Sequence, residues 1–240
     1  MSLRRVLIAG LTALLSAAPV VRAQTPTAES VIARNLQAKG GLEKIRAVQS
    51  LKQTGRVTLQ GMDAEMTIYL RRPNLLRQEI AIAGQTIINA FDGTTAWLIN
   101  PLSGSTNPIV ISGPDAEATK EQSDFDGPLV DFQAKGYTIV LSGTETLNGR
   151  SVTHLTITDR RQRVQHCYLD ADTSLEVKIV NEMPGATLEQ ELSDWRDVQG
   201  VMLPFSLRTS LGGRTVQQLA IQKVDVNPSL DDSLFKMPVR

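Results

Sequence analysis

The sequence carries few residues that could act as a nucleophile or as an acid–base pair. It has one cysteine, Cys167, and two histidines, His154 and His166, in 240 residues. Cys167 directly follows His166 in an alternating segment, and neighbours on a β-strand point to opposite faces, so the two cannot form a hydrogen-bonded dyad. The sequence contains no G-x-S-x-G, P-loop, G-x-G-x-x-G or H-E-x-x-H motif. We therefore expect no catalytic site, and an enzymatic alternative would need His154 with a carboxylate at the floor of a cavity.

The carboxylates do not match a known metal site. Residues 170–174 resemble the start of a calcium loop, but Leu175 stands where that loop requires glycine and Asn181 where it requires glutamate. Two histidines and one cysteine are too few for a zinc site of three or four nitrogen and sulfur ligands. We expect no metal and no cofactor.

The charge balance argues against a nucleic-acid partner. The chain has 25 Lys and Arg against 25 Asp and Glu, and its aromatic content is 4%. Binding to a phosphate backbone needs a basic excess, and stacking on bases needs exposed aromatic rings. We therefore expect no nucleic acid among the partners.

The first 23 residues have the pattern of a secretory signal peptide. Arg4 and Arg5 precede an apolar run over residues 6–21, which is shorter than the roughly 20 residues that span a bilayer. We expect cleavage after Ala23 and a periplasmic location for a single remaining domain, residues 24–240. The alternative is that the segment stays attached as a membrane anchor.

The spacing of apolar residues predicts the elements of this domain. Residues 26–39, with Thr25 as cap, and residues 42–48 have helical spacing. From residue 51 apolar and polar residues alternate, which is typical of strands with one solvated face. Five such segments precede residue 101 and seven follow residue 136, while residues 114–122 and 128–135 are predicted as short helices.

The number of strands determines the predicted fold class. About twelve strands in one domain twist too strongly to form a flat sheet. We therefore predict a mainly β fold with a helical lid, namely an open antiparallel half-barrel of about 11–12 strands. The N-terminal helices and the short inserted helices are expected to cover an apolar cavity.

The apolar faces of the strands are the candidate ligand-binding surface, because a wide curved sheet leaves space that its own side chains do not fill. Leu129 and Phe132, three residues apart, are predicted to close this space as a lid. The alternative is that the apolar strand residues pack against the N-terminal helix as core. The predicted lining residues are Val57, Leu59, Met66, Ile68, Leu70, Ile80, Ile82, Trp97 and Ile99.

A family resemblance rests on seven short segments spread over most of the chain. They are AKGG (38–41), RPNLLR (72–77), FDGTTAW (91–97), DFDGPLVDF (124–132), YLD (168–170), GVMLP (200–204) and LFKMP (234–238). In this order they resemble the LolA-like family of periplasmic lipoprotein carriers, in particular outer-membrane lipoprotein-sorting proteins. The resemblance implies an open half-barrel with a helical lid over a hydrophobic cavity that receives acyl chains.

The resemblance also implies a function in outer-membrane biogenesis. It implies a carrier or chaperone that binds the acyl chains of lipoproteins or lipids without catalysis, with a membrane-anchored receptor and peripheral membrane contacts. In the family an arginine tethers the lid to the barrel, and Arg56, Arg71, Arg72 and Arg77 are the candidates here. Two alternatives stay open: a structural or sensory envelope module that binds a protein partner through a sheet edge, and an enzyme with a small substrate.

Overall fold

A computed structural model describes residues 26–239 of the chain. The predicted signal peptide, residues 1–23, and its cleavage site after Ala23 lie outside the described residues. None of the helices within residues 26–239 combines the length and the hydropathy of a membrane-crossing segment.

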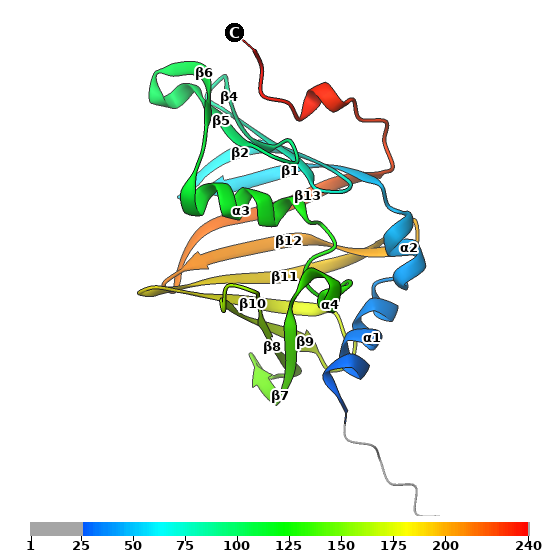
Figure 1. Ribbon diagram of the computed structural model, residues 1–240. Helices are drawn as coiled ribbons and strands as arrows, with labels where there is room; N and C mark the ends of the chain where they lie inside the picture. Colours follow the sequence, from blue (N-terminus) through cyan, green and yellow to red (C-terminus); the bar gives the residue numbers. More distant parts are fainter. Residues whose placement is uncertain (1–25, 240) are drawn as a thin grey trace, which may run out of the picture.

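The thirteen strands of the described chain form one open antiparallel sheet in the order β6-β5-β4-β3-β2-β1-β13-β12-β11-β10-β9-β8-β7 (Figure 1). Within each half, consecutive strands are neighbours, so each half is a meander. The halves join where the first strand, β1, pairs with the last, β13. The sequence prediction of an open antiparallel half-barrel is confirmed.

The elements have the following bounds. The N-terminal half contains α1 (Ala28–Ala38), α2 (Leu42–Ala47), β1 (Ser50–Leu59), β2 (Met62–Arg71), β3 (Leu75–Ile82), β4 (Gln85–Phe91), β5 (Ala96–Asn100), η1 (Pro101–Ser103) and β6 (Ser105–Val110). Between the halves lie α3 (Gly113–Ser123) and α4 (Phe132–Lys135). The C-terminal half contains β7 (Thr138–Leu147), β8 (Arg150–Thr158), β9 (Val164–Asp170), β10 (Glu176–Met183), β11 (Ala186–Val198), β12 (Val201–Leu211), β13 (Arg214–Val226) and η2 (Asp232–Leu234).

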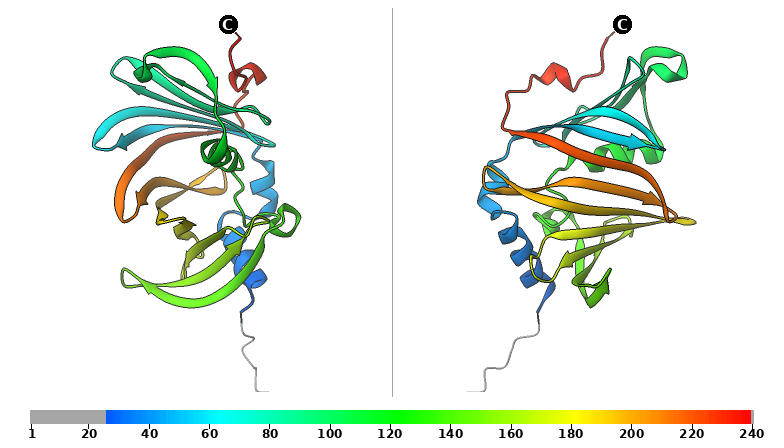
Figure 2. Two further views of the ribbon diagram at one scale, coloured as in Figure 1. Left: turned by 60° about the vertical axis from the view of Figure 1, so that its left-hand side comes forward. Right: turned by 180° about the vertical axis from the view of Figure 1, so that it is seen from behind.

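The connection between β6 and β7 crosses the concave face of the sheet. These strands follow each other in the chain but lie at opposite edges of the sheet, so residues 111–137, the lid segment, must span between the edges. Figure 2 shows α3 inside the curve of the sheet. Asn89 on β4 donates to Thr119 on α3 at 3.2 Å, and Gln78 on β3 donates to Gln122 at 2.9 Å. The helix therefore covers the concave face of the N-terminal meander.

The helix α1 covers the concave face of the C-terminal meander. It begins with a capping box in which the side chain of Thr27 accepts from the Ser30 amide and Ser30 bonds back to Thr27. Val31 and Ile32 on its apolar side are buried. They belong to a second core cluster with Leu129, Ile139, Leu155, Ile157, Cys167 and Leu169.

A first core cluster lies between the lid segment, α2 and the strands of the N-terminal meander together with β12 and β13. It contains Ile45, Val48, Leu51, Val57, Ala64, Met66, Ile68, Leu70, Leu76, Phe91, Ala96, Val130, Val201 and Leu219. Members on neighbouring strands pair across the sheet, as Leu51 with Leu70 and Val57 with Ala64 do. Because alternate residues of a strand share one face, these pairs define the concave face of β1 and β2.

Two predicted lining residues lie on the opposite, convex face. The register pairs Ala96 with Phe91 of the first core cluster, so Trp97 and Ile99 point the other way. The Trp97 indole donates to the backbone oxygen of Phe235 at 2.9 Å, and both side chains are buried under the C-terminal segment. The strand is apolar on both faces, so alternation alone did not identify which face was concave.

Three predicted element boundaries also differ from the structure. β6 is not among the predicted strands, and its Pro108 fits an edge strand, where a missing amide donor is tolerated. The predicted helix at 128–135 is helical only in α4, because Asp131 has a left-handed φ of 53°. The cap of α1 is Thr27, two residues after the predicted cap.

The seam between β1 and β13 depends on a glycine. A side-chain carbon at Gly55 would lie 2.2 Å from the backbone oxygen of Ala220, at the point where the register between the two strands shifts. We expect Gly55→Ala to lower the free energy of unfolding by about 3 kcal/mol, the upper end of the cost of overpacking. Denaturant unfolding measures this change.

The control for this prediction is Arg56→Ala, which removes an exposed side chain from the next position of the same strand. We expect an effect within about 0.5 kcal/mol. Equal stability of the Gly55 variant and the wild type would contradict a tightly closed seam.

Candidate functional site

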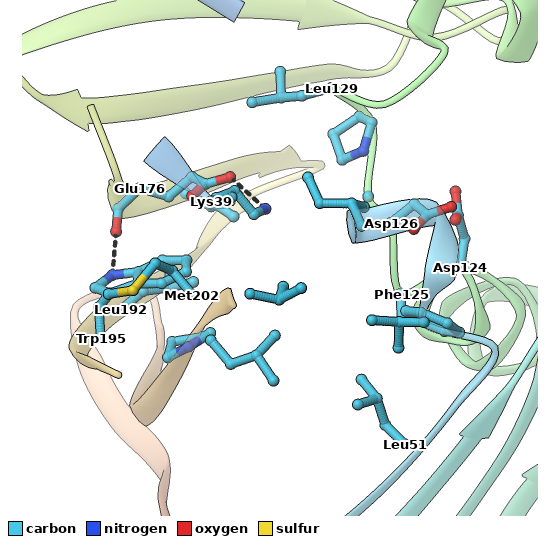
Figure 3. Close-up of a pocket in the computed structure, with 18 of the residues that line it drawn as sticks. Lys39, Leu51, Asp124, Phe125, Asp126, Leu129, Glu176, Leu192, Trp195 and Met202 are labelled. Atoms are coloured by element: carbon cyan, nitrogen blue, oxygen red, sulfur yellow. Dashed lines mark hydrogen bonds and ion pairs between the residues drawn. The ribbon is translucent and has the colours of Figure 1, made fainter. Parts of the chain in front are cut away.

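A cavity of about 260 Å³ lies between the concave face and the lid segment (Figure 3). It is located over the seam, since Leu51 on β1 and Val226 on β13 both border it. The wall is apolar except for the side chains of four charged residues. The lining residues are Lys39, Ile45, Val48, Leu51, Asp124, Phe125, Asp126, Gly127, Pro128, Leu129, Glu176, Ile179, Leu192, Trp195, Val201, Met202, Leu203, Pro204 and Val226.

The two predicted lid residues occupy different places. Leu129 borders the cavity and is buried, in the position expected of a lid residue. Phe132 begins α4 and packs against the second core cluster beside α1. The cavity-facing part of the lid segment is instead residues 124–129.

Seven of the predicted lining residues lie in or against the first core cluster rather than at the cavity. Val57, Met66, Ile68 and Leu70 are buried there, and Leu59, Ile80 and Ile82 pack against them. Within the described chain, none of these seven borders the cavity. A ligand-binding role for them stays a prediction, and it would require the lid segment to move away from the sheet.

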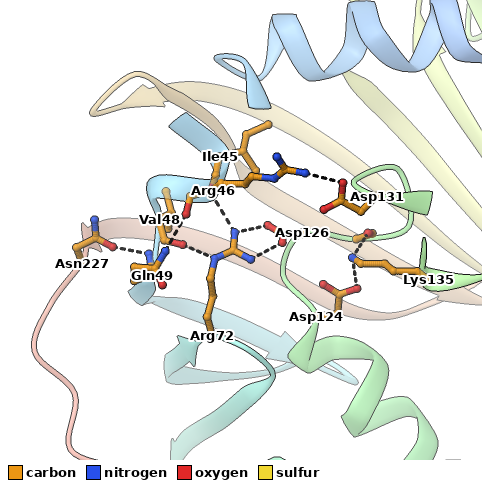
Figure 4. A network of polar contacts seen from close by, with 11 residues as sticks. Ile45, Arg46, Val48, Gln49, Arg72, Asp124, Asp126, Asp131, Lys135 and Asn227 are labelled. Carbon is orange, nitrogen blue, oxygen red and sulfur yellow. Dashed lines mark hydrogen bonds and ion pairs between the residues drawn. The ribbon is translucent and has the colours of Figure 1, made fainter. Parts of the chain in front are cut away.

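Arg72 connects the lid segment to the sheet and to α2 (Figure 4). Its guanidinium donates to both carboxylate oxygens of Asp126, with one Nη2–Oδ1 distance of 2.6 Å. The same group donates to the backbone oxygens of Val48 at 2.7 Å and of Ile45 at 3.1 Å. It also lies 4.8 Å from the centre of the Phe125 ring. A bidentate contact of this kind fixes the relative orientation of the two side chains in addition to pairing their charges.

The other three candidate arginines make no contact with the lid segment among the described residues. Arg71 donates to the backbone oxygen of Leu230 at 2.7 Å, and Arg77 donates to that of Leu234 at 3.0 Å. Both therefore hold the C-terminal segment on the convex face. Arg56 is exposed on that face. Arg72 differs because it follows the end of β2, where its side chain can reach the lid segment.

Other ion pairs also involve the lid segment, and exposure separates the contribution of Arg46 from that of Arg72. Lys135 pairs with Asp124 and donates to the Gly127 backbone oxygen at 2.8 Å, and both contacts lie within the lid segment. Arg46 pairs with Asp131 at 2.7 Å, where both side chains are about half exposed (54% and 46%). The Asp126 side chain is only 10% exposed. Removing Arg72 would thus leave the buried Asp126 carboxylate without a partner. Removing Arg46 would leave Asp131 exposed to water, which solvates its charge.

Lys39 and Glu176 form a second charged group on the cavity wall, opposite Asp124 and Asp126 (Figure 3). The Lys39 ammonium donates to Glu176 Oε1 at 3.1 Å. Sequence reasoning missed this pair, because the two residues are far apart in the chain. The AKGG segment contains Lys39, but neither composition nor spacing indicates its partner.

The histidines lie outside the cavity. His154 and His166 are joined by a nitrogen–nitrogen contact of 2.9 Å, and each contacts a carboxylate, Glu145 at 2.6 Å and Glu182 at 3.1 Å. Register places both rings on the convex face, because their neighbours Leu155 and Cys167 belong to the second core cluster. His154, the acid–base residue that the enzymatic alternative requires at the cavity floor, therefore lies on the opposite face of the sheet. No cluster of three or more His, Cys, Asp or Glu within residues 26–239 is arranged to hold a metal ion.

Cys167 points into the second core cluster, on the face of β9 opposite to His166, as the sequence predicts. Burial raises the pKa of the Cys167 thiol far above its usual value, and the nearby Glu176 carboxylate adds to this effect. Since the thiolate is the reactive form, we expect the native protein to resist thiol reagents. Labelling with a chromogenic disulfide reagent should occur only as fast as the protein opens. Rapid labelling of the native protein would contradict the buried position.

A second prediction concerns the contact between Arg72 and Asp126. We expect Arg72→Ala to lower the free energy of unfolding by about 3–5 kcal/mol, because the Asp126 carboxylate stays buried without its partner. The matched control, Arg46→Ala, removes the exposed pair and should cost less than about 1 kcal/mol. Denaturant unfolding measures both, and hydrogen exchange should accelerate in residues 124–131 of the Arg72 variant alone. Similar costs for the two variants would contradict the role assigned to Arg72.

Comparison with solved structures identifies the fold, whereas no protein-family model and no curated protein matches the sequence. The chain is similar to an outer membrane lipoprotein-sorting protein domain from Vibrio parahaemolyticus, with a TM-score of 0.60 and 13% identity over 86% of this chain and 95% of that one. A DUF1329 family protein from Desulfovibrio piger gives a TM-score of 0.58 and 13% identity over 88% and 98%. A LolA superfamily protein from Nitrosomonas europaea gives 0.58 and 14% over 88% and 98%. The chain therefore has the LolA-like fold that its sequence segments predict.

Proposed function

We propose that the protein is a carrier that holds an acyl chain of a lipid or lipoprotein in the cavity between the lid segment and the sheet. The observation that carries this proposal is the apolar cavity itself, bordered by Leu51, Leu129 and Val201 and closed by polar contacts at its rim. Apolar surface that a fold leaves uncovered is suited to an apolar ligand. The similar fold of a lipoprotein-sorting domain supports the same conclusion.

The size of the cavity limits the cargo. At about 260 Å³ it lies just below the common range for small-molecule pockets, roughly 300–1,000 Å³. With the lid segment in this position the cavity is suited to one chain or part of one. A lipid with several chains requires the lid segment to move, and that movement must break the contact between Arg72 and Asp126.

The energetics suit transfer as well as binding. Burying a sixteen-carbon chain contributes about 12 kcal/mol at about 0.8 kcal/mol per methylene. Association and ordering cost about 4–15 kcal/mol. One chain is therefore held reversibly and can be passed on, and this step makes and breaks no covalent bond.

The proposed setting is the periplasm, reached through the signal peptide predicted at residues 1–23. A membrane-anchored receptor would accept the chain after displacing the lid segment. Asp126 and Asp131 of the lid segment carry ion pairs to the framework that such a receptor would have to replace.

Binding of an apolar probe tests the proposal. We expect N-phenyl-1-naphthylamine to fluoresce on binding the delipidated protein, and acyl chains to appear by mass spectrometry after gentle purification. Leu203→Trp places a large ring at the cavity wall and should weaken binding at least tenfold by filling the space.

The control variant is Leu102→Trp, which makes the same exchange at an exposed position in η1 away from the cavity. It should bind the probe as the wild type does. Absence of both copurified chains and probe binding in a folded wild-type protein would overturn the carrier function.

One observation favours a second candidate, an envelope module that binds a protein partner. The edge strand β6 pairs only with β5 in the described sheet and exposes Ile109 and Val110. An open edge with exposed apolar side chains can accept a strand from another chain. If this were the function, partner binding would be unaffected by Leu203→Trp.

A further inference from the structure

The ion pair of Lys39 and Glu176 is an unusual component of an apolar cavity wall. Lys39 ends α1 and Glu176 begins β10, so the pair joins the helix to the C-terminal meander. The Glu176 side chain is 8% exposed. A Trp195 indole donates to the Glu176 backbone oxygen at 3.0 Å, and the Lys39 ammonium lies 5.9 Å from that ring.

The pair does not use its full hydrogen-bonding capacity. A lysine ammonium has three donors, and within the described chain Lys39 uses one of them, toward Glu176 Oε1. The other carboxylate oxygen, Oε2, is buried and accepts no hydrogen bond from the described residues. A buried polar atom without a partner costs free energy, so a donor that reaches it stabilises the site.

A purely structural role accounts for only part of this arrangement. Ion pairs buried in a protein are often no more stabilising than apolar residues of similar size. Joining α1 to β10 needs only the contact with Oε1. Lys39 and Glu176 both border the cavity, and the unpartnered Oε2 is buried rather than open to the cavity.

The other charged residues at the cavity are occupied by different partners. Asp126 accepts from Arg72, and Asp124 accepts from Lys135. Both lie on the opposite side of the cavity from Lys39 (Figure 3). The Lys39–Glu176 pair is thus the polar group with capacity to bind a ligand.

We propose that Lys39 and Glu176 bind the polar end of the acyl ligand, and that this end is a neutral group with both a donor and an acceptor, such as a carboxamide. The proposal rests on the carrier function. The amide oxygen accepts from the Lys39 ammonium, and the amide N–H donates to Glu176 after a small movement of the carboxylate toward the cavity. The tail then extends along the apolar wall.

The charge of the pair determines which end groups are excluded. Lys39 is already neutralised by Glu176, so a fatty-acid carboxylate would meet the like charge of Glu176 without a free countercharge. An ester has an acceptor but no donor, and it leaves Oε2 without a partner. A carboxamide satisfies both members of the pair.

Three ligands with the same sixteen-carbon acyl chain test this specificity. Palmitamide offers a donor and an acceptor, methyl palmitate an acceptor only, and palmitate an anion. Displacement of N-phenyl-1-naphthylamine from the delipidated wild type measures their affinities, at a pH where palmitate is ionised. We expect palmitamide to bind about tenfold more tightly than methyl palmitate, since hydrogen bonds to charged groups are among the stronger ones. Palmitate should bind most weakly.

Glu176→Gln identifies the residue responsible. Glutamine keeps the shape but removes the negative charge, so Lys39 is left as an unpaired cation, and the order should invert, with palmitate tightest. The matched control is Glu189→Gln, which alters a second Lys–Glu pair, that with Lys178 at 2.8 Å, away from the cavity lining. It should keep the wild-type order. If Glu176→Gln does not fold, the wild-type series still tests the proposal.

The outcomes separate this proposal from the carrier function. If none of the three ligands displaces the probe, the carrier function fails. If all three bind equally, or palmitate binds most tightly to the wild type, the carrier function stands and the assigned specificity is overturned. An N-palmitoylated peptide amide distinguishes the sources of the ligand: binding equal to palmitamide supports an acylated protein, and binding of palmitamide alone supports a free amide lipid.

Discussion

The pairing of β1 with β13 is the constraint on which the rest of the architecture depends. It joins two meanders into one sheet and thereby places β6 and β7, which are consecutive in the chain, at opposite edges. Residues 111–137 must therefore run from one edge to the other, and the burial of Leu129 and Val130 in the two core clusters holds them over the concave face. The lid segment is therefore a consequence of the topology, and its place over the concave face does not depend on its own weak helical signals. Gly55 permits this pairing because its lack of a side chain accommodates the Ala220 backbone.

The position of the cavity follows from what covers each meander. α3 lies on the N-terminal meander and α1 on the C-terminal one, and each forms its own core cluster with the strands beneath it. Over the seam the cavity is bordered by the turn region at residues 124–129, by Ile45 and Val48 at α2, and by Lys39 at the end of α1. The cavity therefore lies between two packed cores. Its walls are supported from both sides, and its cover is held by polar contacts together with the burial of Leu129 and Val130.

Particular residues explain how much the sequence could predict. Alternation predicted the sheet and its apolar faces, because Val57, Met66 and Ile68 occur with period two beside polar neighbours. It failed at Trp97 and Ile99, where both faces are apolar because the C-terminal segment covers the convex one. Arg72 was one of four candidate arginines, and only the fold brings it to Asp126, 54 residues later. Lys39 and Glu176 are separated by 137 residues, so their contact depends on how α1 docks, which local patterns do not encode.

The difference between the two charged groups at the cavity has a consequence for cargo exchange. Arg72 makes four hydrogen bonds, of which two reach Asp126 of the lid segment and two reach the Val48 and Ile45 backbone oxygens of the framework. If the lid segment moves as the proposed carrier function requires, Arg72 would keep its two bonds to the framework and could bind Asp126 again. Lys39 and Glu176 belong wholly to the framework and do not move with the lid segment. In the proposed carrier, opening would expose the tail-binding wall while the polar end of the ligand stays bound, so that a chain would leave tail first.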